Sequence, residues 1–174
     1  MVDESSQKHC RGLSLFELLI TLSIFFILCG LAFPHWHRWV VSHQVMGAES
    51  QLARAIQYAR HLAIDRALSV TLCSGVDKER CDGRWSDGYT IRVLTRVERR
   101  YEGLPSGYQL RWRSSLSKDE ALIFGPDGFT EGQQGTFTIC PPASDADEAR
   151  GLVILRSGRL RFLGPRVYAS CSKP

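Results

Sequence analysis

The sequence predicts an α+β protein in which one long N-terminal helix packs on an antiparallel, β-sandwich-like head. An almost unbroken apolar run occupies residues 13–33, and apolar side chains then recur at helical spacing as far as residue 67. From residue 68 onward, short segments of alternating apolar and polar residues are separated by Gly, Pro and Asp. The first two observations predict the helix, and the third predicts the strands of the head.

The apolar run is long enough to cross a membrane as a helix. Its 21 residues extend roughly 31 Å at ~1.5 Å per residue, which matches the ~30 Å hydrocarbon core of a bilayer. Pro34 closes the run, so we expect a transmembrane helix over residues 13–34. Glu17 stands at the fifth position of the run. Because a charge inside a bilayer costs several kcal/mol, this carboxylate predicts a function and a partner of opposite charge.

Residues 35–67 are expected to continue the helix as an amphipathic segment. Charged and polar side chains, among them Glu49, Arg54 and Arg60, lie mostly away from the apolar face. The Ala residues on that face favour close packing on a sheet over a free coiled coil. The apolar face is formed by Val41, Val45, Ala48, Leu52, Ala55, Ala59 and Leu62.

Residues 68–174 are expected to form a single β domain, which we call the head. Polar loops with Gly, Pro and Asp separate its strands, and no internal repeat or low-complexity linker interrupts it. The predicted strands cover residues 69–73, 89–94, 108–113, 122–124, 136–140, 151–155 and 159–163.

No catalytic motif is found in the sequence. A nucleophile elbow, a phosphate-binding P-loop, an H-E-x-x-H pair and a dinucleotide-binding glycine motif are all missing. His35 and His37 fall on different helix faces, which favours a membrane-interface belt with Trp36 and Trp39 over a metal pair. We therefore expect a protein that is not an enzyme and that binds neither a cofactor nor a metal.

The residues at the start of the apolar run form a specific combination. Basic Arg11 precedes Gly12, apolar Leu13 follows, and Glu17 comes five positions into the run with no second charge. This combination resembles the class III leader of the type IV pilin superfamily. The resemblance implies that residues 1–12 are a leader, which prepilin peptidase removes by cutting after Gly12. It also implies methylation of the new N-terminus at Leu13 and a contact between Glu17 and the α-amino group of a neighbouring subunit. Opposite charges in a low-dielectric medium attract strongly and relieve each other's desolvation.

Two other interpretations of this segment remain open. Gly30-Leu31-Ala32 offers the small-x-small site at which a secretory signal peptide is cut. A plain single-span anchor is the other possibility. The acid inside the apolar run and the length of the run argue against the signal peptide, and a plain anchor has no use for the acid.

Several short motifs follow one another along the rest of the chain. They are Tyr58-Ala59-Arg60, Val70-Thr71-Leu72-Cys73, Trp85-x-x-Gly88-Tyr89, Phe124-x-Pro126-x-Gly128, Thr136-Phe137-Thr138-Ile139-Cys140 and Gly158-Arg159-Leu160-Arg161. Together they resemble the H-pseudopilin branch of the superfamily, which includes the H pseudopilin of type II secretion and the FimT/FimU-type minor pilins. The resemblance implies a long helix on a β-sandwich-like head, an inner-membrane location with the head in the periplasm, and other pilins as partners.

Four cysteines fall in the part of the chain that would face the periplasm, where disulfides persist. They are Cys73, Cys81, Cys140 and Cys171, and three pairings are possible. We favour Cys73 with Cys81, which closes a short loop, and Cys140 with Cys171, which ties the C-terminus to the domain. A zinc site is the alternative, although the spacings are irregular.

A cluster of arginines lies near the C-terminus. From residue 150 to residue 173 there are six basic side chains and no acidic one. Residues 155–161 predict a hairpin with a two-residue Ser157-Gly158 turn, which places Arg156 directly across from Arg159. Arg159 and Arg161 are then expected to share one face, while Leu160 and Phe162 point to the core.

The arginine cluster predicts an anionic partner, because guanidiniums held together repel each other. In the FimT-type proteins a G-R-x-R motif is implicated in DNA uptake, and Gly158, Arg159 and Arg161 match it. The resemblance implies binding of double-stranded DNA, which is expected to be independent of sequence. With about three or four phosphate contacts, log K should fall against log salt at a slope of roughly −3 to −4. The DNA-binding candidates are Arg156, Arg159, Arg161 and Arg166, with Arg111 and Arg113 adding to the field from another strand.

Three alternatives to DNA binding remain for these arginines. They could pack against acids of a neighbouring subunit, pair in cis with the acidic residues 145–148, or form a plain solvated hairpin.

Taking the leader, the helix and the arginine cluster together, we interpret the chain as a minor pilin or pseudopilin that enters a pilus-like filament and captures DNA for natural transformation. The alternative is a structural role without DNA, either as the H-type pseudopilin of a type II secretion system or as a subunit that primes pilus assembly.

Overall fold

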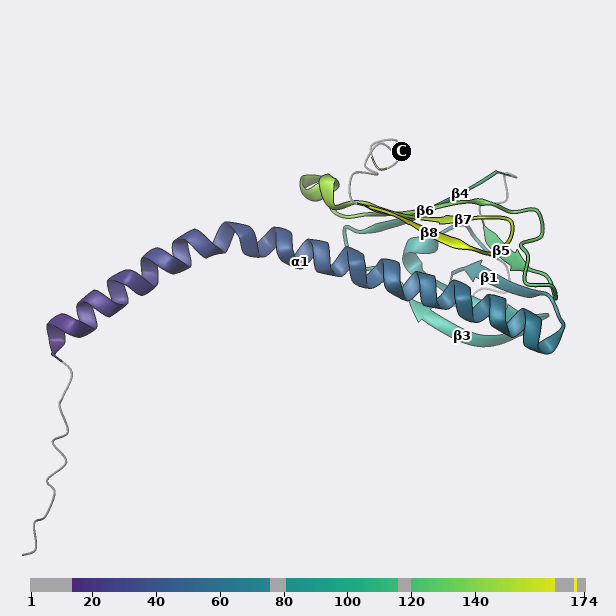
Figure 1. Ribbon diagram of the computed structural model, residues 1–174, viewed down its shortest axis with the longest axis horizontal. Coiled ribbons are helices and arrows are strands. Elements are labelled where there is room, and N and C mark those ends of the chain that lie inside the picture. Colours follow the sequence, from purple (N-terminus) through teal and green to yellow (C-terminus); the bar gives the residue numbers. More distant parts are fainter. Residues whose placement is uncertain (1–13, 76–80, 116–119, 165–170, 172–174) are drawn as a thin grey trace, which may run out of the picture. The chain divides into compact units, whose positions relative to one another are not determined.

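The computed structural model describes residues 14–75, 81–115, 120–164 and 171 (Figure 1). The chain divides into two compact units, Met1–Arg38 and Trp39–Pro174, and each is described by itself. Helix α1, Leu15–Arg66, has 52 residues and supplies secondary structure to both units. This helix confirms the expectation of one long N-terminal helix.

In the second unit, the C-terminal part of α1 packs on the head through its apolar face. Ala55, Ala59 and Ala63 are completely buried, and their small side chains allow the helix to lie close to the strands. The helix ends at Arg66, after which Ala67 adopts a positive φ of 51°. Glu49, expected away from the apolar face, is instead buried at 5% exposure.

One antiparallel sheet, called sheet A, has the strand order β3-β2-β1-β5. Its strands are β1 (Val70–Ser74), β2 (Gly88–Val93), β3 (Arg96–Glu102) and β5 (Ala121–Phe124). The 3-10 helix η1, Trp85–Asp87, leads into β2 and buries Trp85. Strand β3 was not expected from the sequence, and it forms one edge of the sheet.

The other antiparallel sheet, called sheet B, has the order β4-β6-β7-β8. Its strands are β4 (Gln109–Ser114), β6 (Gly135–Cys140), β7 (Arg150–Ile154) and β8 (Leu160–Leu163). The 3-10 helix η2, Ala143–Glu148, joins β6 to β7. The side chains alternate as the sequence predicts, since Leu110 and Trp112 are buried while Arg113 is exposed.

The inner faces of both sheets share one hydrophobic core with α1. Aromatic rings hold its centre, where the Phe137 ring lies 4.3 Å from the Trp112 ring and 4.8 Å from the Trp85 ring, centroid to centroid. Such ring pairs add to the stabilisation from burial of apolar surface. The outer face of sheet B carries the exposed Arg113 and Arg161, and Thr138 on the same face is buried.

Candidate functional site

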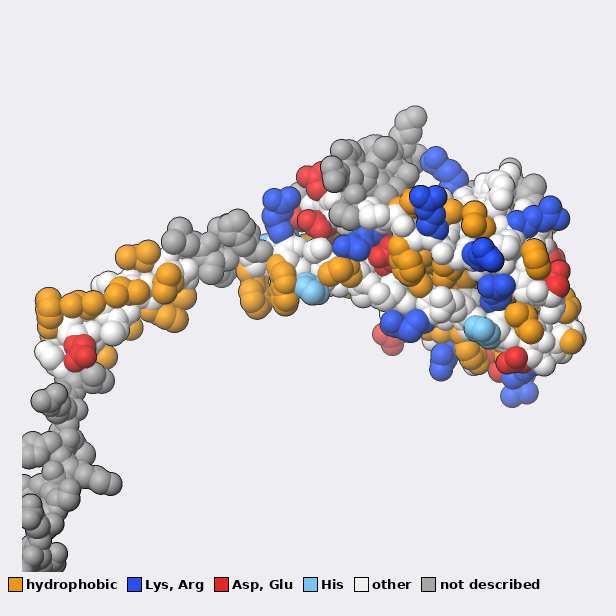
Figure 2. All heavy atoms as spheres, in the orientation of Figure 1, with side chains coloured by type: hydrophobic (Ala, Val, Ile, Leu, Met, Phe, Trp, Pro, Cys, Tyr) orange, Lys and Arg blue, Asp and Glu red, His pale blue; other side chains and the backbone are white. Residues whose placement is uncertain are grey.

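The first candidate site is the N-terminal segment. Gly12 and Leu13, the predicted processing residues, lie outside the described residues. Helix α1 begins at Leu15 and carries Glu17 in its first turn, where the helix dipole favours a negative charge. Glu17 is exposed in the single chain, as are the large apolar side chains around it. Figure 2 shows hydrophobic side chains along this part of the helix.

The two hydroxyl side chains within this apolar stretch bond to their own helix. Thr21 Oγ1 donates to the carbonyl of Leu18 at 2.9 Å, and Ser23 Oγ donates to the carbonyl of Leu19 at 2.8 Å. Such local bonds satisfy the hydroxyls without an external partner.

No helix among the described residues combines the length and the hydropathy that crossing a bilayer requires, which differs from the expectation for residues 13–34.

Two disulfides close loops in the head. Cys73 of β1 is bonded to Cys81, and Cys140 at the end of β6 is bonded to Cys171. This is the pairing favoured from the sequence. The second bridge fixes Cys171 beside the end of sheet B at which Gln109 and Cys140 are paired.

The arginine hairpin forms, but its turn differs from the expected one. Leu155 N–H donates to the Arg159 carbonyl at 3.0 Å, and Gly158 N–H donates to the Leu155 carbonyl at 2.8 Å. The loop is therefore Arg156-Ser157-Gly158, with Gly158 at a φ of 72°. Leu155, and not Arg156, lies across from Arg159, so the predicted two-residue turn was wrong. A three-residue loop with glycine in the left-handed region is the next most common way to close a hairpin.

Arg159 and Arg161 lie on the outer side of sheet B. Leu160 is opposite Ile154 and Arg161 is opposite Val153, so alternation directs Arg161 away from the core, and Arg159 shares its side. Both arginines are exposed. Phe162 was expected in the core but is 55% exposed, because β8 is the edge strand and no further strand covers it.

Arg156 lies in a different environment from the other two arginines. It lines an open hollow together with Asp127 and Glu131. Its carbonyl accepts hydrogen bonds from the backbone N–H of Thr130 at 2.9 Å and from Thr130 Oγ1 at 3.2 Å. The carboxylates nearby make this arginine a weaker candidate for binding an anion. Arg166 lies outside the described residues.

Gly158 is packed tightly between two other parts of the unit. A Cβ atom at this position would lie 2.7 Å from the Gly128 carbonyl oxygen and 2.9 Å from Arg60 Nε. Arg60 Nε itself donates to the Gly128 carbonyl at 3.0 Å. The glycine of the G-R-x-R motif thus has a structural role at the contact between α1, the loop after β5 and the hairpin.

The acidic residues 145–148 do not lie beside the arginine hairpin. They belong to η2, which precedes β7, whereas the hairpin loop follows β7. At ~3.3 Å per residue, the five residues of β7 separate the two by roughly 16 Å. This separation argues against pairing of these acids with Arg156 or Arg159 in cis, and their pairing with the rest of the basic cluster stays a prediction.

A row of residues crosses the outer face of sheet B with an arginine at each end. Arg113 of β4 is opposite Thr136 of β6, Thr136 is opposite Val153 of β7, and Val153 is opposite Arg161 of β8. Arg111 shares the outer side of β4, where its Nε and Nη2 donate to Gln109 Oε1 at 3.1 and 2.7 Å. Lys and Arg side chains are prominent over the head in Figure 2.

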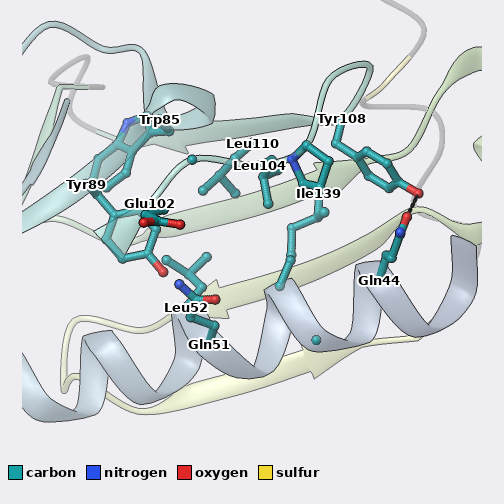
Figure 3. A pocket seen from close by; sticks show the side chains of 14 residues that line it. Gln44, Gln51, Leu52, Trp85, Tyr89, Glu102, Leu104, Tyr108, Leu110 and Ile139 are labelled. Carbon is teal, nitrogen blue, oxygen red and sulfur yellow. Dashed lines mark hydrogen bonds between the residues drawn. The ribbon is translucent and has the colours of Figure 1, made fainter. Parts of the chain in front are cut away.

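A mostly apolar pocket that the sequence did not reveal opens between α1 and the segment from β3 to β4 (Figure 3). Leu52, Trp85 and Leu104 contribute apolar surface, and Tyr108 Oη donates a hydrogen bond to Gln44 Oε1 at its edge. The pKa of Tyr89 in this pocket is raised, mainly because the side chain is buried and to a smaller extent because Tyr101 lies nearby. The residues that line this pocket come from segments far apart in the sequence, so no local sequence motif predicts the pocket.

An ion pair between a buried carboxylate and a half-buried arginine was also missed. Glu49 Oε2 of α1 lies 3.5 Å from Arg150 Nη1 of β7. Burial raises the pKa of Glu49, and the Arg150 charge opposes that shift only in part. In the sequence Glu49 looks like one more charge off the apolar face, and only the approach of β7 buries it.

The fold is similar to that of solved minor pilins. The minor pilin FimU of Pseudomonas aeruginosa matches with a TM-score of 0.58 and 22% identity, over 71% of this chain and 94% of that chain. The minor pseudopilin EpsH of Vibrio cholerae matches with a TM-score of 0.51 and 18% identity, over 72% of this chain and 96% of that chain. No curated protein sequence matched the chain.

Two family descriptions match the sequence itself. Residues 48–158 match the family described as type II transport protein GspH, and residues 7–33 match the prokaryotic N-terminal methylation motif. GspH proteins are structural and non-enzymatic, which confirms the prediction that this chain is not an enzyme. The chain belongs to the GspH family, and it is a minor pilin or pseudopilin with an N-terminal methylation motif.

Proposed function

We propose that this protein is made as an inner-membrane prepilin, is cut after Gly12 by prepilin peptidase, and assembles into a pilus-like filament with other pilins. The observation that carries this proposal is the methylation motif over residues 7–33, which includes Gly12, Leu13 and Glu17, followed by the GspH match. Methylation would fall on the α-amino group of Leu13. The head would face the periplasm, where its two disulfides would persist.

The exposed side chains of the first unit support membrane insertion before assembly. The large apolar residues between Leu15 and Leu28 are 43–77% exposed, which is unfavourable in water and favourable in lipid. Thr21 and Ser23 bond to carbonyls of their own helix, so neither hydroxyl needs water. Glu17 is then the only charge that lipid must accommodate in this stretch, and an amine from a neighbouring subunit would neutralise it.

Mass spectrometry of the protein purified from its own membranes tests the processing step. The expected N-terminal peptide begins at Leu13 and carries one methyl group on its amine. A peptide that retains residues 1–12, or an N-terminus produced near Ala32, would overturn the proposal. In the latter case the segment would be a secretory signal peptide.

We further propose that the head binds double-stranded DNA through Arg159 and Arg161, for uptake in natural transformation. Both arginines are exposed on one side of sheet B, and the four strands of that sheet contain no acidic residue in their described ranges. Arg156 is left out because it shares its hollow with Asp127 and Glu131. Arg166 is retained as a candidate on its position in the sequence alone.

A gel-shift assay with the full-length protein in detergent micelles tests the DNA contact. The variant Arg159→Gln/Arg161→Gln should lose the shift of a duplex probe. Arg96→Gln/Arg100→Gln, which removes two exposed arginines from β3 of the other sheet, is the matched control and should keep it. Equal binding by both variants would refute the assigned site.

The alternative function is a structural one, as an H-type pseudopilin of a type II secretion system or a subunit that primes a pilus. The description of the matched family as a type II transport protein favours it. In that case the wild-type protein would not shift DNA, and secretion genes rather than pilus genes would flank its gene.

A further inference from the structure

We propose that the outer face of sheet B binds a DNA duplex across one groove, with β4 contacting the phosphates of one strand and β8 those of the other. This inference rests on the proposed DNA binding and extends it from the hairpin to the whole sheet. The contacts on β4 are Arg111 and Arg113, and those on β8 and its turn are Arg159 and Arg161.

The strand register sets the distance between the two pairs. Arg113 and Arg161 end the same row, with Thr136 and Val153 between them. Three inter-strand steps of ~4.8 Å place their Cα atoms roughly 14 Å apart. That separation is close to the ~12 Å width of the major groove of B-DNA, so long arginine side chains at the two edges can reach both bordering backbones.

The middle of the row would lie over the groove itself, between the two phosphate backbones. Thr136 and Val153 are uncharged and half-buried, so between the two arginine edges the sheet presents no charge to the duplex. Two separated lines of positive charge match the two phosphate backbones of a duplex. A single strand offers one line of charge and would engage one edge at a time.

The charge balance separates this face from the other sheet. The described strands of sheet B hold arginines and no carboxylate, whereas β3 of sheet A mixes its arginines with Glu98 and Glu102. Glu98 accepts a hydrogen bond from Arg66 at 2.6 Å, so part of the positive charge beside β3 is already compensated. The phosphates of DNA are therefore expected to bind sheet B in preference to sheet A.

The Cys140–Cys171 disulfide is attached to sheet B at some distance from this row. Cys140 is paired with Gln109, four residues along the strands from the pair formed by Thr136 and Arg113. At ~3.3 Å per residue the bridge stands about 13 Å from the row. The bond between Arg111 and Gln109 also holds the Arg111 guanidinium along the outer face, which reduces the side-chain entropy lost on binding.

The test measures the affinity of the full-length protein in micelles for a short duplex at several salt concentrations. Four phosphate contacts predict a slope of log K against log salt of about −3.6, and removal of two contacts should reduce its magnitude by about 1.8. Both Arg111→Gln/Arg113→Gln and Arg159→Gln/Arg161→Gln should show that reduction. Arg96→Gln/Arg100→Gln removes the same charge from sheet A and should leave the slope unchanged.

Two further measurements exclude indirect effects. Arg111→Lys/Arg113→Lys should restore the wild-type slope, because a lysine still neutralises a phosphate. A single strand of the same length should bind more weakly than the duplex. If the lysine variant does not restore the slope, or if the single strand binds as tightly, the two-edge geometry is wrong.

The outcomes distinguish this inference from the function on which it rests. If only the Arg159 and Arg161 variant lowers the slope, the hairpin binds DNA and the role of β4 is refuted. If the wild-type protein binds no DNA, both proposals fail. If, in addition, the arginine variants release the protein from its filament, the face packs against a neighbouring subunit instead.

Discussion

Gly158 shows that one residue of the G-R-x-R motif is required by the fold. We expect Gly158→Ala to lower the free energy of unfolding by about 1–3 kcal/mol, the usual cost of holding a non-glycine residue at a positive φ. The added Cβ would also stand 2.7 Å from the Gly128 carbonyl oxygen, so backbone must shift. Urea unfolding followed by tryptophan fluorescence measures the change.

The matched control for Gly158→Ala is Gly164→Ala, where an added Cβ meets nothing within 4 Å and no positive φ is involved. That variant should unfold like the wild type. Equal stability of both variants would contradict the packing described for the hairpin, and it would return Gly158 to a role in binding alone.

Glu49 gives the stability of the head a pH dependence of defined sign. Within the described part of the chain its buried Oε1 has no hydrogen-bond partner, and burial raises the pKa of its carboxyl above 4.5. The folded state therefore keeps the proton at pH values where the unfolded state has lost it. This contribution to stability is fully present below pH 4.5 and declines as pH rises through the folded pKa.

The variant Glu49→Gln isolates this effect. As pH rises from 4.5, the unfolding free energy of the wild type should fall relative to that of the variant. Urea unfolding at a series of pH values measures it. If the stability of the wild type relative to the variant instead rises with pH, the attraction of Glu49 to Arg150 outweighs the effect of burial on the Glu49 pKa.

At the scale of elements, the two disulfides should contribute unequally. Cys140–Cys171 spans 31 residues and Cys73–Cys81 spans 8. In the chain-entropy model these loops correspond to about 3.7 and about 2.5 kcal/mol. We therefore expect Cys140→Ala/Cys171→Ala to lower the urea midpoint more than Cys73→Ala/Cys81→Ala does. The reverse order would show that local packing at buried Cys73 outweighs loop length.

Elements with regular apolar patterns could be predicted from the sequence, and charged ones could not. The helical spacing from Val41 to Leu62 and the alternation in β4 both follow from burial on one side. Strand β3 was missed because Arg96–Glu102 is rich in charge and stands at an edge, where side chains on both faces reach water. Its turn from β2 has Leu94 at a φ of 54°, without the glycine that signals a hairpin.

The candidate sites divide in the same way. Same-face placement of Arg159 and Arg161 follows from strand alternation, so the sequence was sufficient for it. The loop length that separates Arg156 from them depends on the contacts of Thr130 with the Arg156 carbonyl. Those contacts join segments 26 residues apart, and no local pattern encodes them. The alignment of Arg113 with Arg161 likewise depends on the order of four strands.

At the scale of the whole molecule, the chain carries two surfaces of different chemistry. Apolar side chains are exposed along the beginning of α1, whereas the described outer face of sheet B carries arginine. The first kind of surface is compatible with lipid or with other apolar helices, and the second with phosphate or carboxylate. A filament subunit needs both, since one surface joins it to the assembly and the other remains available for a specific task.

In the proposed assembly Glu17 would link these two roles, because a subunit that does not assemble never brings its head to the filament. We expect Glu17→Gln to be processed normally but to lose association with neighbouring subunits. A charge pair 4 Å apart at an effective dielectric of ~20 is worth about 4 kcal/mol, which corresponds to a loss of roughly 700-fold in association. Affinity purification of filament proteins from sheared cells measures this association.

Glu120→Gln, which removes an exposed carboxylate from the head, is the matched control and should assemble normally. Assembly of Glu17→Gln at the wild-type level would mean that the apolar helix alone drives polymerisation.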